Sequence, residues 1–67
     1  MIAQDLKAVM HEVGSWEELR PDQREALDMI ANKLSRILNG NPDLPDHWID
    51  IAGYSLLIAN RLQKEEN

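Results

Sequence analysis

Apolar residues recur at helical spacing in separate stretches of this chain, and turn-forming residues divide these stretches from one another. The first stretch predicts a helix over residues 2–13. Its apolar stripe consists of Ile2, Leu6, Val9 and Val13. Gly14 is placed to end this helix in a left-handed cap. The run from Ser15 to Glu18 matches a capping box, which predicts a short helical turn over residues 15–19.

Two longer helices are predicted for the rest of the chain. Pro21 suits the first turn of a helix over residues 21–38, and the turn formers of residues 39–43 end it. A third helix follows over residues 45–63. On the second helix the apolar stripe is Ala26, Leu27, Ile30, Leu34, Ile37 and Leu38, and the polar side is Glu25, Asp28, Asn32, Ser35 and Arg36. We therefore expect one all-α domain over residues 1–67, with three helices, of which the last two form an antiparallel hairpin.

The stretch from Trp48 to Ala59 is the most informative part of the chain, because its apolar side chains cover an unusually wide arc of the helix. The arc is about twice the 100° that a surface helix needs, so a domain of this size cannot cover it alone. We expect a homo-oligomer that buries the apolar side of helix 45–63. Its interface residues would be Trp48, Ala52, Leu56 and Ala59. Gly53 costs about 1 kcal/mol in a helix interior, which predicts close packing there. Trp16 and Trp48 are expected to anchor the core.

Composition narrows the classes of protein. The 67 residues include no cysteine and carry a net charge of −5. Without disulfides or thiolate metal sites, a chain this small usually depends on self-association for its stability. An acidic surface repels phosphates, so binding to duplex nucleic acid is not expected. The chain shows neither a signal peptide nor an apolar run long enough to span a bilayer, so we expect a cytoplasmic protein without a membrane partner.

One group of residues combines charge with an aromatic ring near the middle of the expected hairpin. It consists of Lys33, Arg36, Asp50 and Tyr54. An antiparallel hairpin brings the second half of helix 21–38 beside the first half of helix 45–63, so Lys33 or Arg36 is expected to pair with Asp50. Such a pair fixes the register of the hairpin. The alternative is a binding site, since a lysine and an arginine beside an acid and an aromatic ring suit a phosphorylated or nucleotide ligand.

Carboxylates form a second candidate group. Glu25 and Asp28 are three residues apart and Asp46 and Asp50 four apart, so each pair shares one side of its helix. Oxygen ligands of this kind suit magnesium, which keeps several waters. The simpler interpretation is that these acids are solvated and stabilise helix N-termini. We expect no metal or other cofactor, and magnesium only if the chain is an enzyme.

A sequence pattern carries a resemblance to known proteins. Residues 33–36 are Lys-Leu-Ser-Arg, and residues 46–54 are Asp-His-Trp-Ile-Asp-Ile-Ala-Gly-Tyr. Over residues 21–62 this pattern resembles the C-terminal helical pair of small, uncharacterised phage and prophage proteins. Those proteins are in turn distantly similar to the all-α MazG-like nucleoside triphosphate pyrophosphohydrolases, which hold magnesium over the phosphates with acids from two helices.

The resemblance places Asp50 at the aspartate of the second metal-binding motif of the MazG-like enzymes. The chain departs from that motif at His47, where the enzymes have a glutamate. Glu25 and Asp28 match only half of the first motif. The resemblance therefore implies a scaffold that keeps a binding face and lacks the metal site, and we expect no catalytic residue.

Three classes of function follow. The first is a small phage-type accessory protein, in the bacterial host cell if it is phage-encoded, that binds a partner without catalysis. This class includes an inhibitor of a host defence system that occludes a host protein or sequesters a nucleotide. The second is a magnesium-dependent MazG-like nucleotide pyrophosphohydrolase. The third is a structural oligomerisation module.

Overall fold

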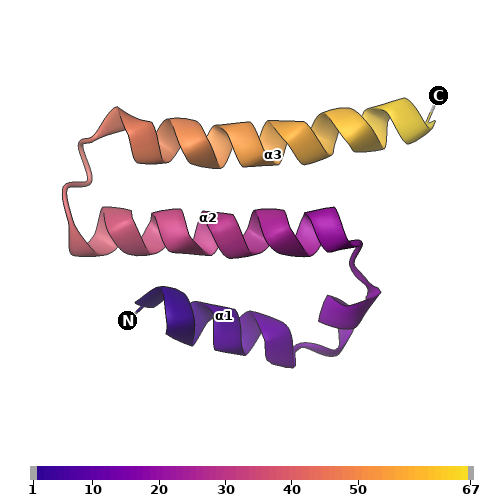
Figure 1. Cartoon of the computed structure of the whole chain (residues 1–67), viewed down its shortest axis with the longest axis horizontal. Helices are drawn as coiled ribbons and strands as arrows, with labels where there is room; N and C mark the ends of the chain where they lie inside the picture. Colours follow the sequence, from indigo (N-terminus) through magenta and orange to yellow (C-terminus); the bar gives the residue numbers. More distant parts are fainter. Residues whose placement is uncertain (1, 67) are drawn as a thin grey trace.

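The chain folds into a flat layer of helices. A computed structural model describes residues 2–66, as α1 (Ile2–Glu12), the short 3-10 helix η1 (Gly14–Glu18), α2 (Pro21–Asn39) and α3 (Pro45–Glu66). The α-helices lie side by side, α2 in the middle and antiparallel to both neighbours (Figure 1). The layer measures 40 by 28 Å across but only 11 Å in depth. It is therefore one helix thick, and both of its faces are open.

The prediction of an all-helical chain with three helices is confirmed, and residues 2–66 contain no strand. The start of the short turn was predicted wrongly. Its N-cap is Val13, without a side-chain cap, so Ser15 lies inside η1 and does not cap it. Gly14 has no positive φ. The reason is that η1 follows α1 directly, so Gly14 is its first residue and has no left-handed cap to form.

Local hydrogen bonds define both ends of α2. Pro21 occupies the first turn, and the backbone N–H of Arg20 donates to Oε1 of Gln23 at 2.9 Å. Asn39 ends the helix, and Gly40 leaves it with φ −129° and ψ −137°. In the following loop the Asp43 N–H donates to the Asn41 side chain at 2.9 Å, a local bond that turns the chain toward α3.

As the central helix, α2 buries two sides. One side faces α3. It carries the buried residues Ala26 and Ile37, together with Lys33, which pairs with Asp50 of α3. The other carries Ala31 and Ser35, also buried. The sequence placed Ser35 on an exposed polar side, and this is wrong. α1 covers that side of α2, and the Ser35 hydroxyl there accepts a hydrogen bond from Asn39 at 3.2 Å.

The two tryptophans have different environments. Trp16 is 8% exposed and its ring stacks on His11 with centroids 4.4 Å apart, so it anchors the corner between α1 and η1. Trp48 is 53% exposed, which corrects the expectation that it anchors the core. Its indole N–H donates to the Pro42 carbonyl at 2.8 Å, so it braces the loop before α3.

The space around two glycines predicts opposite effects of alanine substitution on the free energy of unfolding. A Cβ at Gly53 would meet nothing within 4 Å, whereas one at Gly40 would lie 2.8 Å from the Arg36 carbonyl oxygen. We expect Gly53→Ala to raise the free energy of unfolding by about 0.5–1 kcal/mol, since it removes backbone freedom from the unfolded chain without a clash. Gly40→Ala should lower it. Urea denaturation of both variants measures the contrast, and a loss of stability in Gly53→Ala would show that a second chain packs closely there.

Candidate functional site

An ion pair joins the middle of α2 to the first half of α3. Lys33 Nζ lies 2.8 Å from Asp50 Oδ2, with side chains 14% and 44% exposed. The hydrogen bond from Lys33 lowers the pKa of Asp50, and the charges of Lys33, His47 and Arg36 lower it further. The structure therefore brings together two of the four residues proposed from the sequence, with lysine rather than arginine as the partner of Asp50.

Arg36 and Tyr54 occupy different positions around this pair. Arg36 is exposed, one helical turn beyond Lys33, and no ion pair to it is formed within residues 2–66. Its charge reaches Asp50 without direct contact. Tyr54 is half-buried and lies against Ala26, where it lines hollows of the surface. Lys33, Arg36 and Asp50 thus form a local charged group, with Tyr54 one turn of α3 away.

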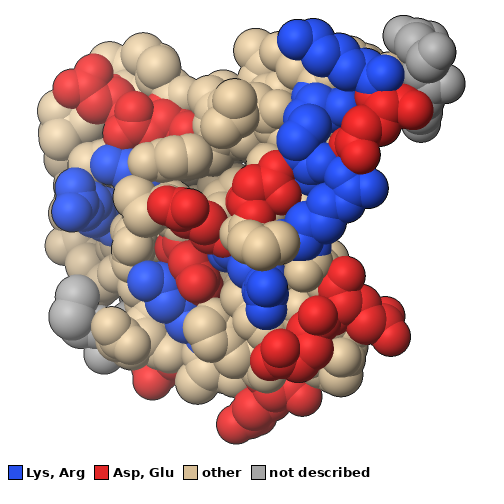
Figure 2. Space-filling view, turned by 45° about the vertical axis from the view of Figure 1, so that its right-hand side comes forward, with Lys and Arg blue, Asp and Glu red and all other residues tan. Residues whose placement is uncertain are grey.

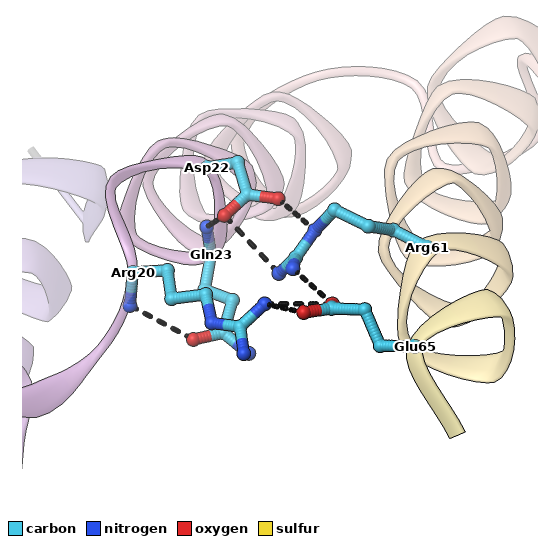
Figure 3. A network of polar contacts seen from close by, with 5 residues as sticks. All are labelled: Arg20, Asp22, Gln23, Arg61 and Glu65. Atoms are coloured by element: carbon cyan, nitrogen blue, oxygen red, sulfur yellow. Dashed lines mark hydrogen bonds and ion pairs between the residues drawn. The ribbon is translucent and has the colours of Figure 1, made fainter. Parts of the chain in front are cut away.

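A larger polar network closes the open end of the hairpin (Figure 3). Arg20 donates from Nη1 to both carboxylate oxygens of Glu65, and Arg61 Nη1 donates to the same carboxylate at 2.6 Å. Arg61 also pairs with Asp22, to which its Nη2 donates at 3.2 Å. The network ties the start of α2 to the last turns of α3. These contacts explain why α3 continues to Glu66, beyond the expected end at residue 63.

Sequence reasoning missed this network. The spacing of Arg61 and Glu65 by one helical turn was a usable signal for an ion pair within the helix. The link from Arg20 to Glu65 joins positions 45 residues apart, and only the packed hairpin reveals it. The hydrogen bond between them lowers the pKa of Glu65 and raises the pKa of Arg20.

The carboxylates considered for magnesium are dispersed. Asp28 Oδ1 lies 2.9 Å from Nε2 of His11 on α1, and Asp50 is held by Lys33. Glu25 lines a hollow of about 190 Å³ on the other flank of α2. Within residues 2–66 no cluster of three or more histidine, aspartate or glutamate side chains is arranged to hold a metal ion.

Figure 2 shows how charge is distributed over one view of the molecule: acidic and basic side chains interleave across it and crowd together where α3 ends. On α2, Asp22, Glu25 and Arg36 recur at helical spacing and therefore share one side of the helix, called the charged face. Glu25 and Leu27 are two positions apart, and therefore point to opposite sides of α2, about 200° from each other. The charged face and the face that carries Leu27 are thus opposite faces of the layer.

Comparison of the chain with known protein families, with curated proteins and with solved structures gave no significant match. In the part of the chain that the structure describes, no helix has the length and apolarity needed to cross a membrane.

The lowered pKa values predict how stability changes with pH. The folded pKa values of Asp50 and Glu65 lie below their ordinary values of 3.8 and 4.5. Their ionised forms therefore stabilise the fold above those values, and this contribution is lost as the pH falls through the lower folded pKa values. We expect urea midpoints to fall between about pH 6 and pH 3, and to fall less in the double variant Asp50→Asn, Glu65→Gln.

The control for this measurement is Asp5→Asn on the exposed surface of α1, which removes one acid without touching the Lys33–Asp50 or Arg20–Glu65 pairs. Equal losses in the wild type and the double variant would contradict the assignment of this pH dependence to Asp50 and Glu65.

Proposed function

We propose that this chain is a helical binding module that works as a homo-oligomer and does not catalyse a reaction. The observation that supports this most strongly is the incomplete core. Among the described residues, no large side chain is fully buried. The large apolar side chains that stay exposed are Val9, Val13, Leu27, Leu38, Leu44, Trp48, Ile49, Leu56, Leu57 and Leu62. So much exposed apolar surface is typical of a chain that is completed by a partner.

α3 contributes most to this surface. It packs mainly against α2, and its remaining sides include Trp48 and Leu56, 53% and 60% exposed. Ala52 and Ala59 are also exposed. These are the residues that the sequence suggested for self-association. A second copy is the partner we propose, because neither disulfides nor a metal cluster within residues 2–66 supplies the stability that a small chain needs.

Binding without turnover is supported by the use of the candidate catalytic acids. Of these acids, Asp50 lies in an ion pair with Lys33, and Asp28 forms a hydrogen bond with His11. The pair of Lys33 and Asp50 fixes the hairpin, and Arg36 and Tyr54 beside it are available to a partner. We propose that this charged face binds a host protein or a nucleotide, and that the chain serves as a phage-type accessory protein in the cytoplasm of a bacterial host.

Native mass is the first test of the proposal. Size-exclusion chromatography with light scattering should give a multiple of the 7.7 kDa chain at micromolar concentration. Ala52→Glu should shift this mass downward if α3 forms the interface, because an unpaired charge in a packed interface costs several kcal/mol. A stable 7.7 kDa monomer at high micromolar concentration would rule out the oligomer.

A nucleotide assay tests the absence of catalysis separately. Incubation with the common nucleoside triphosphates and magnesium should release no pyrophosphate above background. Magnesium-dependent release that disappears in Asp50→Asn would replace the binding module with a pyrophosphohydrolase.

A further inference from the structure

Two hollows lie next to each other on the face opposite the charged one. The first, of about 270 Å³, lies between α2 and α3 and includes Ile30 and Ile58 in its lining. The second, of about 250 Å³, lies between α2 and the corner of α1 and η1, and Trp16 is part of its lining. Leu19 and Leu27 line both hollows. The two adjacent hollows are together called the groove, and their lining residues come from α1, η1, α2 and α3.

The groove has no charged lining residue among those that the structure describes. Its described lining residues are Met10, Val13, Ser15, Trp16, Leu19, Gln23, Ala26, Leu27, Ile30, Tyr54, Ser55 and Ile58. Asp, Glu, Lys and Arg make up 28% of the chain. The charges are therefore directed to the other face and edges of the layer. A groove of this kind does not suit an acidic or basic partner, since it offers no opposite charge. It suits an apolar surface that is equally free of charge.

The shape of this face is self-complementary. Leu27 stands between the two hollows and is still 40% exposed, and Val13 at the far end is 52% exposed. A side chain flanked by two hollows can enter a hollow of a second copy after a two-fold rotation whose axis lies between that side chain and the hollow, and the second copy then does the same in return. Isologous interfaces of homodimers need such a match within one surface patch.

The area of the face is sufficient for a stable dimer. A layer of 40 by 28 Å outlines about 1,100 Å² on each face. Two such faces together offer at most about 2,200 Å², so a standard interface of roughly 1,600 Å² requires that most of each face is covered. The net charge of −5 on each copy does not oppose this contact, since the charged faces point outward and stay hydrated.

We propose that two copies of this chain stack groove against groove, so that two layers enclose the apolar core that a single layer lacks. This inference rests on the proposed self-association and names its surface: the groove centred on Leu19 and Leu27, and not the outer edge of α3 around Leu56. The charged faces of both copies, with Lys33, Arg36 and Asp50, remain outside and free to bind a partner.

The test compares leucine-to-lysine substitutions in the groove, on the charged face and on the outer edge of α3. Leu27→Lys places a charge in the centre of the groove. Leu57→Lys, the matched control on α3, places it near Asp22 and Glu25 on the charged face. Leu56→Lys alters the outer edge of α3. Sedimentation equilibrium should show that Leu27→Lys raises the dissociation constant of the dimer at least a hundredfold, whereas the two other variants change it less than fivefold. Circular dichroism checks that all three stay helical.

Cysteine cross-linking keeps the test decisive if Leu27→Lys does not fold. The chain has no cysteine, so a single introduced cysteine reports the contacts of its own position only. Because Ser55 lies to one side of the groove centre, a thiol-reactive cross-linker with a flexible spacer should link two copies of Ser55→Cys, and should leave Glu25→Cys, on the charged face, unlinked. If the wild type is an oligomer that dissociates in Leu56→Lys but not in Leu27→Lys, the groove interface is wrong and the proposed oligomer stands. A wild type that is monomeric at high micromolar concentration would overturn both, and would leave the groove to an apolar segment of another protein.

Discussion

Replacement of Trp16 by alanine is expected to lower the free energy of unfolding by about 3–5 kcal/mol, the largest loss expected from a single substitution in this chain. Trp16 is 8% exposed and is the largest side chain among the buried residues. Removal of a buried tryptophan costs about 3–5 kcal/mol, whereas a chain of this length has about 3–10 kcal/mol of stability in total. The ring also stacks on His11, which pairs with Asp28, so its loss should loosen α1 from α2. Urea denaturation followed by circular dichroism measures the effect.

Trp48→Ala is the matched control, because Trp48 is 53% exposed and keeps one hydrogen bond, to the Pro42 carbonyl. Loss of one such bond costs about 1 kcal/mol. If both tryptophan variants lose the same stability, the burial of Trp16 at the corner of α1 and η1 does not anchor the fold.

Ile37→Ala is expected to have the second largest effect. Ile37 is 7% exposed on the side of α2 that carries Lys33, so its truncation leaves a cavity in the hairpin. Such truncations cost about 2–5 kcal/mol, depending on how far the neighbours relax. The melting temperature should fall by tens of degrees at the upper end of that range, since about 1 kcal/mol shifts it by roughly 4–8 °C in a domain of this size.

The adjacent residue provides the control. Leu38 is 66% exposed, and its truncation in a monomer should cost less than about 0.5 kcal/mol. Both variants should therefore be compared over a range of protein concentrations. A Leu38→Ala variant as unstable as Ile37→Ala at every concentration would contradict the burial pattern of α2.

The helices could be predicted from the sequence because their signals are local. Pro21 and the turn formers after Asn39 define α2, and the periodic apolar positions define its stripe. The pair of Lys33 and Asp50 could be anticipated as well, since an antiparallel hairpin with a short loop brings these two positions together.

Burial could not be predicted from periodicity alone. The sequence indicated one apolar stripe on α2, but Ser35 is buried because α1 packs on the opposite side. Trp48 is exposed because α3 has a neighbour on one side only. Whether a side chain is covered depends on how the helices are arranged, and this arrangement depends on contacts between residues far apart in the sequence, such as Arg20 and Glu65.

The central position of α2 also limits how cooperative the single chain can be. α2 packs against α1 along one side and against α3 along the other. Ion pairs from Lys33 and Arg61 hold the α3 side, whereas a hydrogen bond between His11 and Asp28 joins α1 to α2. Substitutions in α1 and in α3 that lie away from Leu19 and Leu27, the two residues that line the hollows on both sides of α2, should therefore have nearly additive effects on stability. In hydrogen exchange, α1 should open as a unit of its own while the amides of α2 and α3 stay protected, so the smallest unit that folds independently is the helical hairpin.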